Sequence, residues 1–81
     1  MLINYKSNGK KTMREFSSIY IRTDKDKGLF SPEMCSLIGV SNDGKTVVLL
    51  TNLQRKKADK IYKRIQRQLN NPMWMGGVIN V

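Results

Sequence analysis

At 81 residues the chain is long enough for one small domain, and its 40% apolar content favours a folded core over a disordered segment. The single cysteine, Cys35, excludes an internal disulfide and, together with the lack of histidine, excludes an ordinary zinc site. Fifteen basic residues against six acidic ones give a net charge of +9, which favours a polyanionic partner such as nucleic acid or an acidic protein surface.

The N-terminal stretch is predicted to be weakly structured. The protein is predicted to be cytoplasmic. We expect residues 1–12 to form a loosely ordered strand or arm, with a loop or hairpin turn in the polar segment 7–11. This stretch lacks the apolar core of a signal peptide, and no part of the chain approaches the ~20 apolar residues of a membrane span. The low cysteine content agrees with a reducing compartment, so we expect a cytoplasmic protein that does not enter a membrane.

A half-buried strand is predicted within residues 16–23. Ile19 and Ile21 alternate there with Tyr20 and Arg22, which is the period of two expected when one face of a strand is buried. On the outward face, Tyr20 beside Arg22 is a candidate platform on which a nucleic-acid base could stack.

A solvated, charged loop is predicted for residues 24–28. Asp24, Asp26 and Gly28 have a faint likeness to a calcium-binding loop. The segment lacks the third ligand, the glycine at the sixth position and the glutamate at the twelfth position of such a loop, and lysines separate its aspartates. We therefore expect no metal site.

A β-hairpin is predicted over residues 34–51. Two apolar runs rich in β-forming residues flank Asp43-Gly44, and an Asp-Gly pair in this setting favours a two-residue type I′ turn. That turn sets a register in which Val40 faces Val47, Ile38 faces Leu49, and Leu37, Val48 and Leu50 lie on the opposite face. Both faces are apolar, so we expect a helix to cover one face and more chain, or a second copy in a homodimer, to cover the other.

The segment GVSNDGKT, residues 39–46, matches the pattern G-x-x-x-x-G-K-[ST] of phosphate-binding loops in nucleotide hydrolases. In such a loop a helix follows directly, so that its amides and N-terminus surround the phosphates. Here the four residues after Thr46 are the strand-forming sequence VVLL, and the predicted helix starts only about six residues later. The context favours the hairpin turn, and we expect neither a nucleotide nor any other cofactor.

One long amphipathic helix is predicted at about residues 52–70. Thr51 and Gln54 have the spacing of a capping box, and Pro72 follows the last helical residues. An apolar stripe about 100° wide is formed by Ala58, Ile61, Tyr62, Ile65 and Leu69. The fold class we expect is α+β: a small antiparallel sheet of three to five strands with this helix packed on one face, in a single domain of residues 1–81. Residues 72–81, with a Gly-Gly hinge, are a candidate edge strand.

The side of this helix opposite the apolar stripe is cationic. At 100° per residue, Lys56, Lys60, Lys63 and Arg67 fall within about 60° of one another, while Lys57 and Arg64 lie on one flank and Arg55 on the other. Asp59 is the only acidic residue in this segment, and Glu–Lys pairs at i,i+4 are absent. Three interpretations remain open: a lysine-rich solvated face without a ligand, a surface that contacts nucleic-acid phosphates, and a docking surface for an acidic protein or nucleoprotein.

We predict a non-enzymatic small basic binding protein, because the six acidic residues form no convincing catalytic pair. The leading hypothesis is contact with nucleic acid, or with a nucleic-acid–protein complex, through the cationic helix face together with Tyr20 and Arg22. The alternative is a protein–protein interaction module, an inhibitor or adaptor that docks on an acidic partner surface. Lys, Ile and Asn, which AT-rich codons encode, are abundant, so we expect an AT-rich source: a low-GC bacterium or one of its mobile elements, a phage or plasmid. A second candidate partner patch is formed by Met73, Trp74 and Met75.

Overall fold

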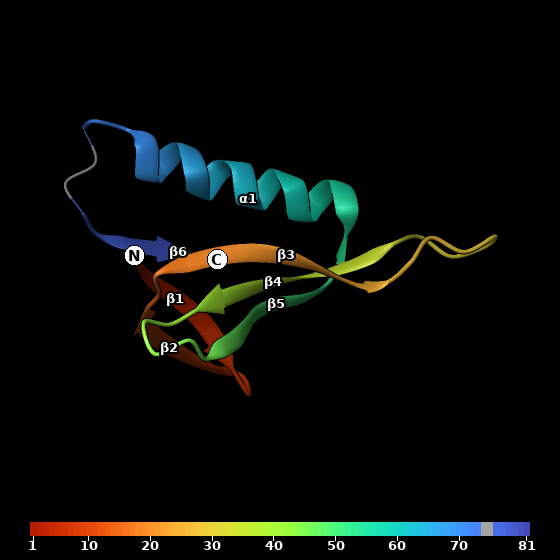
Figure 1. The fold of residues 1–81 in the computed structure, drawn as a ribbon, viewed down its shortest axis with the longest axis horizontal. Coiled ribbons are helices and arrows are strands. Elements are labelled where there is room, and N and C mark those ends of the chain that lie inside the picture. Colours follow the sequence, from red (N-terminus) through yellow and green to blue (C-terminus); the bar gives the residue numbers. More distant parts are fainter. Residues whose placement is uncertain (74–75) are drawn as a thin grey trace.

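Two three-stranded sheets and one helix make up the fold of the computed structural model, which describes residues 1–73 and 76–81 (Figure 1). The fold is a small α+β arrangement, as predicted, but its strands are divided between two sheets rather than placed in one. The elements are β1 (Leu2–Ser7), β2 (Lys10–Glu15), β3 (Ser18–Lys25), β4 (Met34–Val40), β5 (Thr46–Gln54), α1 (Arg55–Asn70) and β6 (Val78–Asn80).

The first sheet has the order β2-β1-β6. Strands β1 and β2 pair antiparallel through the two-residue loop Asn8-Gly9, in which both residues have positive φ (51° and 80°), as a type I′ turn requires. Residues 1–12 thus form most of a paired hairpin. At the other edge β6 runs parallel to β1, with Ile79 opposite Ile3, so the two ends of the chain lie side by side.

The second sheet has the order β3-β4-β5 and is antiparallel throughout, with β4 in the centre. The hairpin of β4 and β5 exists, but the predicted two-residue type I′ turn is wrong. The Ser41 amide donates to the Lys45 carbonyl (2.9 Å) and the Gly44 amide donates to the Ser41 carbonyl (2.9 Å), which makes a three-residue loop over 42–44. Only Gly44 has positive φ in this loop (85°). This is the longer hairpin in which a type I turn precedes one left-handed residue.

The side chain of Asp43 explains why the longer loop forms. Its carboxylate accepts hydrogen bonds from the Ser41 hydroxyl and from the Lys45 amide (3.1 Å), which bridges the turn and holds Asp43 at negative φ. The Ser41 bond, followed by the Lys45 bond, lowers the pKa of Asp43.

The added loop residue changes the predicted register of the hairpin. Val40 pairs with Thr46 rather than with Val47, and Ile38 pairs with Val48 rather than with Leu49. Val48 therefore shares the face of Ile38 instead of lying opposite to it. Two irregularities further along the ladder, one of them near Asn52 at a φ of 59°, shift the pairing again before the strand ends.

Helix α1 begins at Arg55, later than predicted, because β5 continues to Gln54 and pairs with the start of β4. The predicted capping box is wrong. Thr51 lies within β5, where its hydroxyl shares a hydrogen bond with the Ser36 hydroxyl (3.1 Å between the oxygens), while Gln54 occupies the N-cap position without a side-chain capping bond. The helix ends at Asn70 as predicted, but it is not the last element, since β6 follows it.

One hydrophobic core joins both sheets and the helix. The largest buried cluster contains Ile3, Tyr5, Phe16, Ile19, Leu37, Leu49, Ile65 and Ile79. A smaller cluster of Cys35, Leu53 and Ala58 lies at the start of α1, so the single cysteine is a buried apolar residue. Among the described residues, no helix has the length and apolar character needed to cross a membrane.

Between β3 and β4 the chain leaves the sheet as an arm. Lys25 and Met34 are the last paired residues of the two strands, and residues 26–33 continue beyond them (Figure 1). The arm lies at one end of the longest dimension of the molecule, 45 Å, next to the first turn of α1.

Candidate functional site

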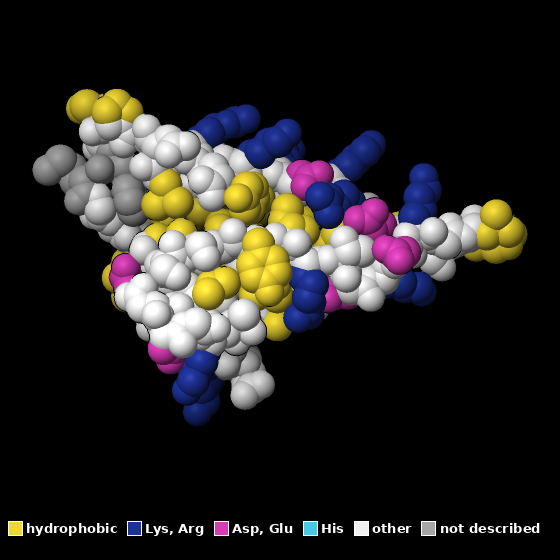
Figure 2. Space-filling view, in the orientation of Figure 1, with side chains coloured by type: hydrophobic (Ala, Val, Ile, Leu, Met, Phe, Trp, Pro, Cys, Tyr) yellow, Lys and Arg dark blue, Asp and Glu magenta, His cyan; other side chains and the backbone are white. Residues whose placement is uncertain are grey.

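Helix α1 presents a continuous cationic face to solvent. Ala58 and Ile65 are buried and fix which side of the helix meets the sheets. At 100° per residue, six basic residues then occupy an arc of about 120° on the outer side. All six are exposed: Lys56, Lys57, Lys60, Lys63, Arg64 and Arg67. Figure 2 shows Lys and Arg side chains standing out along this side of the helix. We call these six residues the cationic face.

The charges of the cationic face are not neutralised by acidic residues. Within residues 1–73 and 76–81, none of the six makes an ion pair. Arg64 instead donates to the backbone carbonyl of Asn80 (2.9 Å) and so ties the helix to β6. The cationic face therefore keeps its positive charge available for a partner.

Arg55 does not belong to the cationic face, although the sequence grouped it with the other helix cations. Its guanidinium lies on the opposite flank, 3.5 Å from a carboxylate oxygen of Glu33 and 3.3 Å from one of Asp59. Hydrogen bonding with the Cys35 side chain, and then the charges of Asp59 and Glu33, raise the pKa of Arg55. Arg55 therefore joins the base of the arm to the helix and contributes little free charge.

Five of the six side chains of the cationic face border a shallow groove of about 420 Å³. Ile61 lies among the groove residues, and the others are Lys57, Lys60, Lys63, Arg64 and Arg67. The sequence assigned Ile61 to the core stripe, but it lies at the edge of that stripe and is only partly buried. The groove thus combines an apolar residue with a cationic rim, which suits a ligand that carries anionic groups beside an apolar surface.

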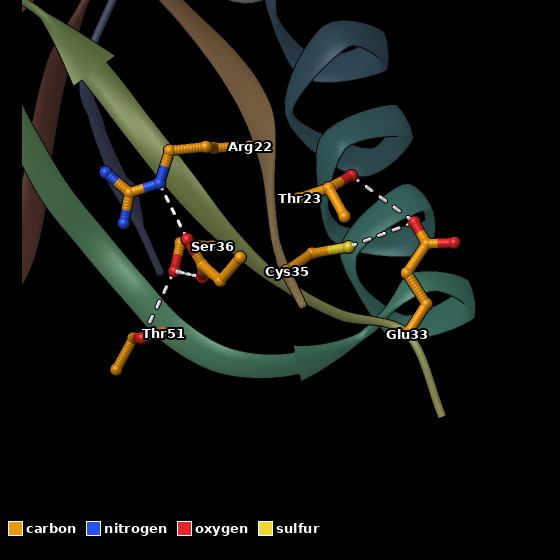
Figure 3. A network of polar contacts seen from close by, with 7 residues as sticks. Arg22, Thr23, Glu33, Cys35, Ser36 and Thr51 are labelled. Atoms are coloured by element: carbon orange, nitrogen blue, oxygen red, sulfur yellow. Dashed lines mark hydrogen bonds and ion pairs between the residues drawn. The ribbon is translucent and has the colours of Figure 1, made fainter. Parts of the chain in front are cut away.

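The structure places Tyr20 and Arg22 away from the cationic face. Ile19 on the same strand packs into the core with Ile65 of α1, so alternation along β3 directs Tyr20 and Arg22 to the opposite side of the sheet. Tyr20 is 42% exposed there. Figure 3 shows Arg22 near Ser36 on that side.

Arg22 belongs to a polar network on the second sheet (Figure 3). Its Nε donates to a carboxylate oxygen of Asp24 (2.7 Å), and the Ser36 hydroxyl also donates to Asp24. The Ser36 bond first, and the Arg22 bond second, lower the pKa of Asp24. Asp24 is therefore a stable carboxylate near neutral pH rather than a proton donor. In the described part of the chain, no group of three or more His, Cys, Asp or Glu side chains is placed so that it could hold a metal ion.

Two further sequence motifs have structural outcomes. Thr46, the last residue of the segment 39–46, begins strand β5, so the amides of that segment do not lie at a helix N-terminus as in a phosphate-binding loop. Met73 of the predicted partner patch is 82% exposed, whereas Trp74 and Met75 lie outside the described residues.

Comparisons with protein-family models, curated proteins and solved structures find no significant match to this chain.

Proposed function

We propose that this protein is a non-enzymatic binder of nucleic acid, or of a nucleic-acid–protein complex, and that the cationic face of α1 is its contact surface. The observation that carries the proposal is the set of six exposed basic residues on one side of one helix, none of them paired with an acid in the described structure. Lysine and arginine side chains in such a row neutralise backbone phosphates, which positions a protein on nucleic acid without reading its sequence.

The energetics of the free helix support a polyanionic partner. Like charges at i,i+3 and i,i+4 repel, and the cationic face contains several such pairs, including Lys56–Lys60 and Lys63–Arg67. The first turn carries Arg55, Lys56 and Lys57 and no acidic residue, although the N-terminal end of a helix dipole is itself positive. This arrangement disfavours the isolated helix, and bound phosphates would relieve the repulsion.

Charge reversal on the helix tests the proposal. The variant with Lys56→Glu, Lys60→Glu and Lys63→Glu should lose binding to fluorescent mixed-sequence oligonucleotides, measured by anisotropy at about 50 mM salt. Wild-type binding should weaken steeply with salt, with log K falling by ~0.7–0.9 per phosphate contact for each log unit of salt.

A matched control separates a local site from the effect of net charge. The control is a triple variant with Lys6→Glu, Lys10→Glu and Lys11→Glu. It changes the net charge by the same amount, at exposed positions of the β1–β2 hairpin away from α1. This control should retain most of the binding. Equal loss in both triple variants, or no binding by the wild type to single-stranded or duplex oligonucleotides, would reject the proposal.

The groove beside Ile61 supports a second candidate function, docking on an acidic partner protein. An acidic amphipathic segment could place an apolar side chain against Ile61 and its carboxylates against the surrounding lysines. A pull-down from source cells distinguishes the two functions. Capture of one specific protein that survives nuclease treatment supports protein docking, and loss of all captured material after nuclease supports nucleic-acid binding.

A further inference from the structure

The tip of the β3–β4 arm exposes two large apolar side chains. Leu29 is 91% and Phe30 is 95% exposed, more than any other large apolar residue in the described structure. Figure 2 shows hydrophobic side chains at the far end of the arm. Turn positions are ordinarily occupied by glycine, proline or short polar residues, so Leu-Phe here has no explanation in the local backbone. Adjacent exposed apolar residues at a projecting point indicate a contact with something outside the chain.

The tip is held in a defined shape. The Gly28 amide donates to the Ser31 carbonyl (3.0 Å), which closes a tight turn with Leu29 and Phe30 between the two bonded residues. Residues 26–33 lie beyond the last strand pair, so four residues lead out to the tip and four lead back. An extended run of four residues spans about 13 Å, which is how far the tip can stand from the sheet. The two apolar side chains are therefore presented at the end of a narrow projection.

The base of the arm is fixed to the start of the cationic helix. Glu33 pairs with Arg55, the first residue of α1, and also accepts from the Thr23 hydroxyl (3.4 Å; Figure 3). Arg55 is followed at once by Lys56 and Lys57 of the cationic face. Lys25 at the end of β3 and Lys27 on the arm make no ion pair within residues 1–73 and 76–81. A polyanion lying along α1 would thus continue past the arm.

We propose that Leu29 and Phe30 form an apolar wedge that enters the minor groove of duplex DNA and unstacks a base step, while the cationic face holds the phosphates. The inference rests on the proposed function and narrows its ligand to duplex DNA. The minor groove is about 6 Å wide and 7.5 Å deep, which a two-residue turn on a projecting arm can enter. Apolar side chains such as leucine and phenylalanine are the kind that proteins insert between base steps to kink a duplex. From Lys56 to Arg67 the helix rises about 17 Å, the length of roughly five base-pair steps.

The test measures distortion of the duplex separately from binding to it. The full chain is titrated into a duplex that carries 2-aminopurine at a central step and a donor–acceptor dye pair at its ends. Wild-type protein should increase the 2-aminopurine fluorescence and shorten the end-to-end distance. The double variant Leu29→Ser, Phe30→Ser should lose both signals and bind roughly 5- to 150-fold more weakly, the range expected for losing one stacking contact with a base. Its salt dependence should match that of the wild type, since its phosphate contacts are unchanged.

Two controls make the assignment specific. Met13→Ser removes an exposed apolar residue from β2, far along the chain from the arm, and should leave both distortion signals intact. The variant Leu29→Met, Phe30→Trp keeps an apolar tip and should retain them. Leu29 and Phe30 bury almost no surface, so both tip variants should keep the wild-type circular dichroism and urea midpoint.

The outcomes separate the wedge from the proposed function. The wedge is overturned if the wild type binds the duplex without distorting it, or if the Leu29→Ser, Phe30→Ser variant distorts the duplex as the wild type does. Either result leaves the proposed function standing. Absence of any oligonucleotide binding would reject both. The wedge is also overturned if the Leu29→Ser, Phe30→Ser variant behaves like the wild type on duplex DNA but loses another interaction. Loss of binding to vesicles that contain anionic lipid would assign the tip to a membrane, and loss of self-association would assign it to a second copy.

Discussion

At the scale of single residues, the two glycines that define the phosphate-loop pattern have separate structural roles. Gly44 takes the left-handed position of the hairpin loop, at a φ of 85°. Gly39 lies against the ring of Phe16, where an added Cβ atom would stand 2.7 Å from a ring carbon. Phe16 is completely buried and contacts Tyr5 edge to face, so its ring has little room to move. The motif therefore arises from a turn and a packing contact that happen to be five residues apart.

Gly39→Ala should destabilise the protein by about 1–3 kcal/mol, because the methyl group overlaps the Phe16 ring. Urea unfolding followed by circular dichroism measures the loss. Gly28→Ala is the matched control, since an added Cβ there meets its nearest atom at 3.6 Å, and should change the free energy of unfolding little. Equal stability of Gly39→Ala and wild type would show that Phe16 does not pack on Gly39.

At the scale of elements, local signals predicted the type of each element better than its ends. The apolar stripe of α1 and the alternation of Ile19 and Ile21 could be read from the sequence because each follows from the geometry of one element. The start of α1 could not, because Leu53 and Gln54 are held in β5 by pairing with Cys35 and Met34, which lie far earlier in the chain. The pairing of Arg55 with Glu33 was missed for the same reason.

The N-terminus of α1 is an element whose stability can be improved. Gln54 has the extended backbone of an N-cap residue but makes no capping bond, and three basic residues follow it. Gln54→Asp should raise the free energy of unfolding by about 0.5–2 kcal/mol, because aspartate accepts from a free amide of the first turn and opposes the positive end of the helix dipole. Gln54→Ala should show no such gain in the same urea titration, and an equal gain in both variants would contradict the capping explanation.

At the scale of the whole molecule, the concentration of charge on one helix has a measurable effect on stability. The protein carries a net charge of +9, and the six residues of the cationic face account for much of it. Sodium chloride should therefore raise the urea midpoint of the free protein by screening this repulsion. The variant with Lys56→Gln, Lys60→Gln and Lys63→Gln should start from a higher midpoint at low salt and respond less to added salt. An identical salt response in the two proteins would show that the cationic face does not oppose folding.

The division into two sheets was not predictable from the sequence, although strands at the positions of β3, β4 and β5 were, and β2 was not predicted as a strand. Nothing in residues 78–80 indicates that they pair parallel to residues 2–4, and a short terminal strand has the same local signal whichever sheet it joins. The cationic face was predictable because helical periodicity fixes it. The apolar tip at Leu29 and Phe30 was not singled out, since only the structure shows that the arm buries neither side chain.

The pairing of β1 with β6 also sets an order of events during synthesis. Asn4 and Asn80, whose side chains hydrogen-bond across these strands, are 76 residues apart. At ~5–20 residues per second, a ribosome takes about 4–15 s to make the residues between them. During that time the edge of β1 that later pairs with β6 is unsatisfied and can pair with other chains, so the first sheet is completed only once residues 78–80 have emerged.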